Sequence, residues 1–398
     1  MRNWLPLAIT LAVQSMVAMA LLTLPVMAIA VARSLNVTPA LVGLYVAIVY
    51  IGAMAASLAA GTAVKRWGAI RVSQLGLLLC AAGLAVCMLP HLPAMAAGAF
   101  LIGLGYGPIT PASSHLLAKT TSQQHMSLVF SVKQTGVPLG GVLAGAVVPS
   151  LAVQTGWQAA LLCVAAACVA CIALAQPLCK SLDDDRDPRQ PLGFGNLAHP
   201  VRIVWQHPAL RRLAACSFMF SMVQLSLTTY LVTYLNLTLG LGLVAAGAAL
   251  SFAQVGGMFG RVLWGAIADR WTGALPMLAG LAVLMAAAAL ATAALGPALP
   301  SWLMLSVLVV FGMTAIGWNG VYLAEIARQA PAGLAGVATG GALAITFLGV
   351  VLGPPVFGAI AELTGSYRAA YAALAVPTLL CALGLVQRRP AAQAAQTP

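Results

Sequence analysis

The chain has 398 residues, of which 62% are hydrophobic and 7% are charged. A soluble globular domain carries about 25% charged residues, so this composition excludes a soluble protein and predicts an all-α membrane protein. The net charge of +12 also fits a nucleic-acid-binding protein. The basic residues gather in loops between apolar segments, however, so we expect the lipid bilayer, and no nucleic acid, as a partner.

No motif predicts an enzyme, a cofactor or a metal site. The sequence holds no Gly-x-x-x-x-Gly-Lys-Ser/Thr phosphate loop, and its five histidines lack metal-ligand spacing. The eight cysteines form no paired motif beyond Cys168-x-x-Cys171, which lies in an alanine-rich run, and we interpret them as small buried hydrophobic side chains. Any transport would therefore draw its energy from a gradient.

The first apolar segment is similar to a secretory signal, with Arg2 before it and Ala28-Ile29-Ala30 at its end. The run from Trp4 to Ala32 is longer than the roughly 7 to 15 apolar residues of a signal peptide and long enough to cross a bilayer. We interpret it as the first transmembrane helix.

Segments of about 20 apolar residues, separated by Gly, Pro and charged clusters, predict twelve transmembrane helices. One long polar insertion divides them six and six. We predict an N-terminal six-helix bundle at 1–176, a cytoplasmic linker at 177–210, a C-terminal six-helix bundle at 211–387 and a cytoplasmic tail at 388–398. The expected helices are 5–31, 40–62, 71–89, 94–118, 126–150, 157–176, 211–235, 243–266, 275–295, 301–324, 335–361 and 368–387.

The basic residues predict the orientation of the chain, because short cytoplasmic loops are enriched in Lys and Arg. The odd-numbered connections hold only Arg33 and Arg368. The termini add Arg2, Arg388 and Arg389 to the opposite side, so both termini are expected in the cytoplasm of a bacterial-type inner membrane. The even-numbered connections hold Lys65, Arg66, Arg71, Lys119, Lys180, Arg186, Arg189, Arg202, Arg211, Arg212, Arg270 and Arg328.

Three short matches indicate an internal repeat of one six-helix unit. Segment 35–38 (LNVT) matches 235–238 (LNLT), segment 155–160 is similar to 365–370, and segment 61–71 matches 265–273. Each pair lies at equivalent helix junctions. Duplication of a six-helix unit in parallel is the architecture of secondary transporters with two rocking halves, so the two bundles are predicted to be pseudo-symmetric.

At these loop residues the chain resembles the major facilitator superfamily. The loop signature of that family, roughly Gly-x-x-x-Asp-Arg-x-Gly-Arg/Lys-Arg/Lys, is matched by Gly265 to Gly273, which includes Asp269 and Arg270. In the first half Arg66 and Gly68 fit the signature, but Lys65 replaces the aspartate that, by resemblance, helps to hold the cytoplasmic gate shut. The resemblance implies the twelve-helix fold of this family and leaves the subfamily and the substrate open.

A second resemblance concerns helix 5. Segment 136–141 (GVPLGG) is similar to the Gly-Pro-x-x-Gly-Gly pattern of drug/proton antiporters. The helix-4 arginine of those antiporters is missing, and Ala99 stands near its place. A proton-coupled efflux pump for drugs or metabolites therefore remains the alternative function.

The stretch 127–145 places Lys133 and Gln134 inside a predicted span. A charge at membrane depth costs at least about 2.5 kcal/mol, so it usually faces water or a partner. Residues 1–182 contain no Asp or Glu, so Lys133 has no acidic partner in its own half. We hypothesise that it binds an anionic substrate, a small carboxylate or similar organic anion. The alternative is that its side chain extends to the membrane interface.

Other polar side chains near mid-span are candidates for a central cavity. An amide side chain without a hydrogen-bond partner is costly in lipid. Alternatively these residues only bond neighbouring helices. The candidate substrate-binding residues are Lys133, Gln134, Gln14, Tyr106, Gln224, Gln254, Trp318 and Asn319.

Charged residues near the cytoplasmic ends predict a gate. We expect Arg261, Asp269 and Glu325 to lie close together in a network of ion pairs, with Glu325 as an alternative carrier of a coupling proton. The candidate gating or coupling residues are Lys65, Arg66, Gly68, Arg261, Asp269, Arg270 and Glu325. The predicted protein is a secondary active transporter that works by alternating access, expected as a monomer. A substrate sensor or membrane scaffold is the third possibility.

Overall fold

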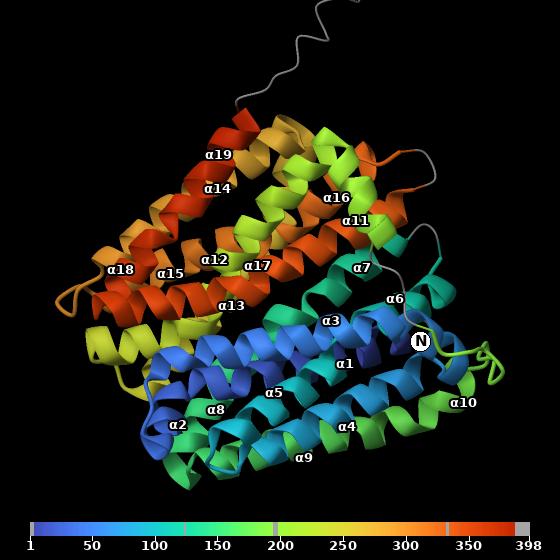
Figure 1. The fold of residues 1–398 in the computed structure, drawn as a ribbon, viewed down its shortest axis with the longest axis horizontal. Helices are drawn as coiled ribbons and strands as arrows, with labels where there is room; N and C mark the ends of the chain where they lie inside the picture. The colour runs from blue at the N-terminus through green and yellow to red at the C-terminus, as the bar shows by residue number, and fades with distance from the viewer. Residues whose placement is uncertain (1–3, 123–124, 194–197, 332–333, 387–398) are drawn as a thin grey trace, which may run out of the picture.

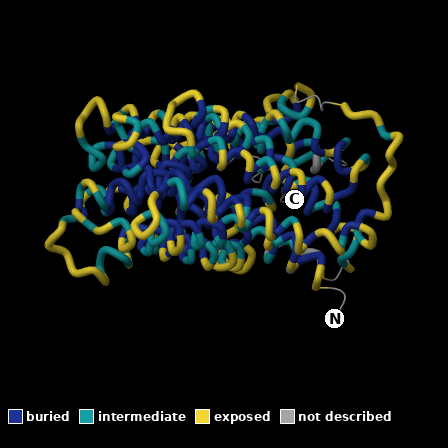
Figure 2. Tube along the Cα trace, turned by 90° about the horizontal axis from the view of Figure 1, so that it is seen from below, coloured by how far each residue is buried: buried dark blue, intermediate teal, exposed yellow. Residues whose placement is uncertain are grey.

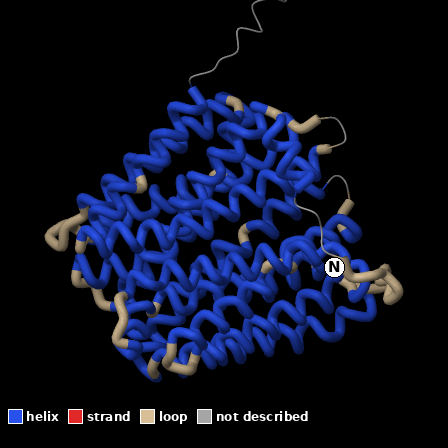
Figure 3. The backbone as a smooth tube through the Cα atoms, in the orientation of Figure 1, coloured by secondary structure: helices blue, strands red, loops and turns tan. Residues whose placement is uncertain are grey.

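A computed structural model describes residues 4–122, 125–193, 198–331 and 334–386 of the chain. These residues form helices joined by short turns, and none of them lies in a β-strand (Figure 3). Twelve helices are long and apolar enough to cross a membrane, which confirms the predicted all-α membrane fold. The predicted tail 388–398 lies outside the described residues.

Among the described residues, the first six spans are built from ten α-helices and two 3-10 helices, because several spans are interrupted by a turn. The spans are, in order, α1 (Leu5–Val26) with α2 (Ala28–Leu35); η1 (Pro39–Leu41) with α3 (Val42–Trp67); α4 (Ala69–Cys87); α5 (Leu92–Tyr106) with α6 (Ile109–Thr120); α7 (Met126–Gln134) with α8 (Gly136–Thr155); and α9 (Trp157–Ala175) with η3 (Gln176–Leu178) and α10 (Cys179–Leu182).

A linker helix α11 (Ala198–Gln206) precedes the second six spans. They are α12 (Pro208–Leu239); α13 (Leu243–Ile267) with η4 (Ala268–Thr272); α14 (Ala274–Ala294); α15 (Ser301–Gly317) with α16 (Asn319–Gln329); α17 (Ala335–Thr364); and α18 (Tyr367–Ala373) with α19 (Ala375–Val386). Span 7 begins three residues before the predicted start, because Pro208 sits at the first helical positions, where its missing N–H costs nothing.

The two sets of six spans lie in separate halves of the molecule (Figure 1). Packing inside each half buries small and apolar side chains, while residues such as Leu162, Leu174, Phe259 and Val262 remain exposed. Buried residues run through the interior and exposed ones lie outside and at the ends (Figure 2). Large apolar side chains on the outside are what a lipid-facing surface requires.

The turns between spans support the internal repeat. Gly68 and Gly273 both have positive φ, at 95° and 76°, and each precedes the helix that follows the matched loop. In the match between segments 35–38 and 235–238, however, the helices end at different residues. Asn36 ends α2 in a left-handed conformation, whereas the matched Asn236 is still inside α12, and Gly240 takes the equivalent left-handed position one turn later. Helix α12 continues because its sequence stays apolar to Leu239.

Two equivalent helix pairs join the halves. Helix α8 of span 5 packs on α13 of span 8, and α3 of span 2 packs on α17 of span 11. The repeat relates span 2 to span 8 and span 5 to span 11, so the two contacts are copies of one another. Backbones approach closely in both: a Cβ on Gly145 would clash with the carbonyl of Gly247, and one on Gly43 would clash with Pro354.

The small residues of span 5 form two rows with different partners. Gly136 and Gly140 lie against Gln14 and Ser15 of α1, inside the first half. Gly141 and Gly145 lie against α13 of the second half. Close backbone packing therefore joins span 5 to the rest of its own half and to the second half.

Different parts of the linker contact different halves. The carboxylate of Asp183 accepts hydrogen bonds from the backbone N–H groups of Ile70 (2.8 Å) and Arg71 (3.0 Å), at the start of α4. Further along, the backbone N–H of Asp187 donates to the carbonyl of Lys65 (2.8 Å). Helix α11 instead packs on α17 of the second half. We call the face of the molecule that carries these contacts the linker side, and the other the far side.

Candidate functional site

Lys133 is buried where span 5 is interrupted. Helix α7 ends at Gln134 and α8 begins at Gly136, so Thr135 forms a short break in the span. The Lys133 side chain is 1% exposed. No described residue forms a hydrogen bond or an ion pair with its ammonium group, and no acidic side chain is among the charges that act on it. The side chains of Ser127 and Ser131, in the same stretch, lie outside the description.

A second positive charge stands beside Lys133. Arg261, on α13 of the other half, is close enough for the two charges to repel each other. Its Nη1 donates to the backbone carbonyl of Gln134 at 2.6 Å, and its Nε donates to the carbonyl of Ile316 at 3.2 Å. The structure thus holds two cations, one from each half, with neutral groups as the partners of Arg261.

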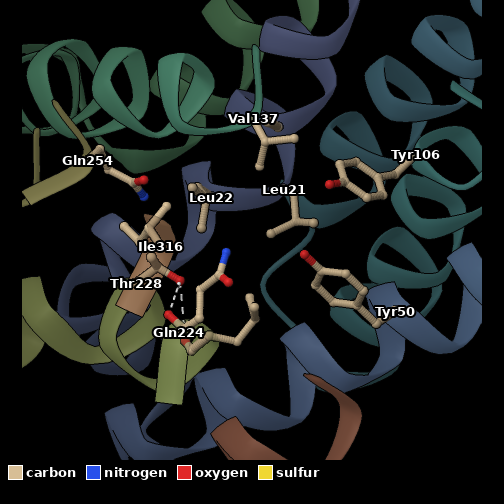
Figure 4. Close-up of a pocket in the computed structure, with 11 residues that line it drawn as sticks. Leu21, Leu22, Tyr50, Tyr106, Val137, Gln224, Thr228, Gln254 and Ile316 are labelled. Atoms are coloured by element: carbon tan, nitrogen blue, oxygen red, sulfur yellow. Dashed lines mark hydrogen bonds between the residues drawn. The ribbon is translucent and has the colours of Figure 1, made fainter. Parts of the chain in front are cut away.

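A central cavity of about 30 Å³ lies between the halves and is lined by residues of both (Figure 4). A space of this size holds one or two water molecules. Ile316 connects the cavity to Arg261, since it lines the cavity and its backbone carbonyl accepts a hydrogen bond from the Arg261 Nε at 3.2 Å. The cavity is lined by Ala18, Leu21, Leu22, Tyr50, Tyr106, Val137, Gln224, Leu225, Thr228, Gln254 and Ile316.

Three of the predicted substrate-binding residues line the cavity: Tyr106, Gln224 and Gln254. Lys133 does not, but Val137, one helical turn further along span 5, does. The sequence reasoning missed Tyr50, whose ring meets that of Tyr106 edge-on with centroids 5.8 Å apart. An alternation of apolar and polar residues would have been needed to find it, and the surrounding sequence of α3 is uniformly apolar.

Gln14 is a buried amide with a spare donor. Its Oε1 accepts a hydrogen bond from the Thr110 hydroxyl at 3.3 Å, whereas its Nε2 has no partner among the described residues. The side chain is 1% exposed and packs on Gly136, three residues after Lys133. The stretch around Lys133 therefore holds two buried donors without acceptors.

Gln224, Trp318 and Asn319 form one hydrogen-bonded group in the second half. The Oε1 of Gln224 accepts from the indole N–H of Trp318 at 3.0 Å and from the Asn319 amide at 3.4 Å. Trp318 stands at the break between α15 and α16 and is 1% exposed. These contacts hold the Gln224 side chain at the cavity wall. Gln224 therefore lines the cavity, as predicted, and also bonds a neighbouring helix, as the alternative predicted.

The expected ion-pair network forms, but it contains Arg328 in place of Arg261. Arg328 bonds Asp269 at 3.1 Å and approaches Glu325 at 3.7 Å, and both contacts lie on the linker side of the second half. The prediction that Arg261 shares this network is wrong, because its guanidinium bonds the backbone carbonyls of Gln134 and Ile316. Arg328 takes its place, at i+3 from Glu325, a spacing that the sequence already showed.

The first-half loop is held by the linker. The side chains of Lys65, Arg66 and Arg270 make no hydrogen bond or ion pair within the part of the chain that the structure describes. Asp183 packs against Gly68 instead, and burial raises the pKa of its carboxyl. Asp183 was not a predicted site residue, because nothing in its local sequence shows that it reaches Ile70.

Fold and site together define an integral membrane protein with two equivalent six-helix halves around a central cavity. The family model of the Major Facilitator Superfamily matches residues 7–344. The chain therefore belongs to the Major Facilitator Superfamily, as the loop signature indicates.

Two transporters of known sequence are similar to this chain. An uncharacterised MFS-type transporter of Mycobacterium tuberculosis (strain CDC 1551 / Oshkosh) is 28% identical over 279 residues, which cover 69% of this chain and 60% of that protein. A gentisate transporter of Corynebacterium glutamicum is 26% identical over 311 residues, covering 72% of this chain and 65% of that protein. The chain thus spans about 60% to 65% of the length of these relatives.

Solved structures share the fold over nearly the whole chain. A bacterial homologue of the human lysosomal transporter Spinster, in an inward-facing and occupied conformation, matches with a TM-score of 0.70 and 16% identity, covering 97% of this chain and 95% of that one. The nucleoside transporter NupG matches with a TM-score of 0.73 and 17% identity, covering 96% of this chain and 99% of that one. At these identities the similarity concerns the fold.

Proposed function

We propose that this protein is a secondary active transporter that moves a small organic anion, such as a carboxylate, by alternating access. The observation that carries the proposal is the pair of cations at the boundary of the halves. Lys133 is 1% exposed and has no acidic partner among the described residues, and Arg261 beside it bonds neutral carbonyls. A buried ammonium group without an acidic partner is costly, and an anion that lies between Lys133 and Arg261 would offset that cost.

One relative supports the anionic substrate. The gentisate transporter carries an organic anion in its name and shares 26% identity with this chain. The runner-up, a proton-coupled efflux pump, is favoured by the Gly136–Gly141 pattern of span 5. A hydrophobic cation would meet repulsion from Lys133 and Arg261, so the charges favour the anion.

We place both termini and the linker in the cytoplasm of a bacterial inner membrane, because the linker side carries most of the basic loop residues. In that orientation the close backbone contacts between halves, at Gly43 and Gly145, lie toward the outer face. The outer path is then closed in this conformation. We propose a monomer as the transporting unit.

Thermal unfolding of the purified protein in detergent tests the substrate class. Organic carboxylates and hydrophobic cationic drugs are screened on the wild type, on Lys133→Ala and on the exposed-site control Lys65→Ala. A ligand at about 100 times its Kd stabilises by about 2.7 kcal/mol, which is readily measured. We expect carboxylates to stabilise the wild type and Lys65→Ala and to lose that effect on Lys133→Ala. Stabilisation by cations alone would replace the proposal with drug efflux.

Glu325 is our candidate for the coupling proton. It is 7% exposed on α16, accepts a hydrogen bond from Gln329 at 2.7 Å and lies near Arg328. In vesicles with an imposed proton gradient, Glu325→Gln should lose accumulation of the anion and keep exchange of labelled for unlabelled anion. Accumulation that survives the substitution would assign Glu325 to the ion-pair network alone.

A further inference from the structure

The carbonyl group of Gln134 lacks its usual helical partner. In an α-helix the carbonyl of one residue accepts from the N–H four residues later. The residue four positions after Gln134 is Pro138, which has no N–H. The proline therefore frees one strong acceptor at the break of span 5, inside the membrane, where an unpaired carbonyl is costly.

Arg261 of the other half supplies the missing donor. Its Nη1 lies 2.6 Å from the Gln134 carbonyl oxygen. Other hydrogen bonds between the halves link Tyr230 to Ala40 and Ser251 to Val142. Along spans 5 and 8, Val142 and Ser251 both lie nearer the far side than Gln134 and Arg261. The Arg261–Gln134 bond is thus the one nearest the linker side.

In the Arg261–Gln134 bond, a charged guanidinium donates to a neutral carbonyl, which is a weaker acceptor than a carboxylate. A guanidinium forms stronger, two-pronged hydrogen bonds with a carboxylate than with a single neutral carbonyl. Lys133 is the residue next to Gln134, so an anion held by Lys133 would lie beside the same guanidinium. The carboxylate and the Gln134 carbonyl would then compete for Arg261.

We propose that Arg261 couples binding of the anion to separation of the halves: it bonds the Gln134 carbonyl freed by Pro138 when the site is empty and turns to the carboxylate when the site is filled. The inference rests on the proposed anionic substrate for its second step. Its first step, that Pro138 and Arg261 together hold the halves in the observed conformation, stands without a substrate.

Pro138→Ala tests the first step, because alanine returns an N–H to the helix that competes with Arg261 for the Gln134 carbonyl. The matched control is Pro25→Ala, a buried proline inside α1 that forms no hydrogen bond to the second half among the described residues. Arg261→Gln removes the charge directly. The distance between the halves is measured by pulsed electron resonance with spin labels at Ser122→Cys and Ala327→Cys, after the exposed Cys163 is changed to serine.

We expect Pro138→Ala and Arg261→Gln to shift the population away from the wild-type distance by about tenfold, the effect of losing one hydrogen bond to a charged group, while Pro25→Ala keeps the wild-type distribution. A carboxylate that stabilises the protein should shift the wild type in the same direction and change Pro138→Ala less. If both variants match the wild type, the Arg261–Gln134 bond does not hold the halves and the inference is wrong. If the variants shift but no carboxylate does, the first step stands and the anionic substrate fails.

Discussion

At the scale of single residues, the protein keeps an ammonium group in a place where physical chemistry disfavours it. Lys133 is 1% exposed, its own half has no carboxylate, and the charge of Arg261 repels its ammonium group. Such an arrangement lowers the stability of the fold, and natural proteins retain such residues where function needs them.

This view predicts that Lys133→Met raises stability while it removes function. Methionine has a similar length and carries no charge to desolvate, so we expect the free energy of unfolding to rise by about 1 to 3 kcal/mol. Thermal unfolding measures the gain, and vesicle uptake measures the loss of anion transport. Lys65→Met, at an exposed lysine, should change stability by less than about 0.5 kcal/mol. A clear loss of stability in Lys133→Met would show that the ammonium has a stabilising partner.

At the scale of elements, the linker supplies an aspartate to the start of α4. By resemblance the family has an aspartate in this loop, and here Lys65 stands there. Asp183 of the linker bonds the N–H groups that open α4, where the helix dipole favours a negative charge. The four aspartates of segment 183–187 thus lie beside a half that has no acidic residue of its own.

Removal of this contact should loosen the linker and the start of α4. Asp183→Ala leaves the N–H groups of Ile70 and Arg71 unpaired, and we expect a loss of about 1 to 2 kcal/mol of stability. Hydrogen exchange should increase in peptides that cover 69–74 and 183–193. The control is Asp187→Ala, whose side chain bonds only the nearby N–H of Arg189. Unchanged exchange at 69–74 in Asp183→Ala would contradict the assignment.

The attachment of the linker should also depend on pH. The Lys119 ammonium bonds Asp184 and Asp185; the bond to Lys119 lowers the pKa of Asp184, and the bonds from Lys119 and His115 outweigh partial burial and lower that of Asp185. A lowered pKa means that the contribution is present above the unfolded value of 3.8 and is lost as the pH falls through the folded value. Hydrogen exchange of 183–193, corrected for its intrinsic rate, should therefore rise between pH 5 and pH 3. Lys119→Met should exchange faster at pH 5 and show a smaller rise.

At the scale of the whole molecule, the two halves are joined by glycine-lined contacts that occur twice. A Cβ at Gly145 would overlap the Gly247 carbonyl and the Ser251 hydroxyl, and one at Gly43 would overlap Pro354. Because both contacts lie toward the far side, they keep that side closed in this conformation.

Gly145→Ala should therefore push the halves apart at the far side and slow transport. The control is Gly280→Ala on α14, where no atom lies within 4 Å of an added Cβ and the helix gains from alanine by about 1 kcal/mol. Vesicle uptake together with thermal unfolding measures both effects: we expect lower uptake and stability for Gly145→Ala, and unchanged uptake with higher stability for Gly280→Ala. Normal transport by Gly145→Ala would show that this contact tolerates a wider spacing.

Much of the architecture could be predicted from the sequence, because a bilayer imposes local rules. Every span must be long and apolar, and every break must carry Gly, Pro or charge, so the twelve spans and the family signature are visible in short windows. The burial of Lys133 follows from the same rule. The repeat was visible too, although the match at Asn236 misplaced a turn by one helical turn because similar letters need not share a conformation.

The partners of the buried groups were decided by the tertiary structure. Which residue meets Arg261, which aspartate reaches the start of α4 and which tyrosine lines the cavity all depend on the crossing of helices far apart in the chain. Local sequence sets the length and depth of a helix, but its rotation against distant neighbours is set by side-chain packing across the whole molecule. The sequence by itself therefore determined a twelve-helix membrane protein with a buried lysine, and only the three-dimensional packing placed Arg261 beside it, on a carbonyl that Pro138 leaves free.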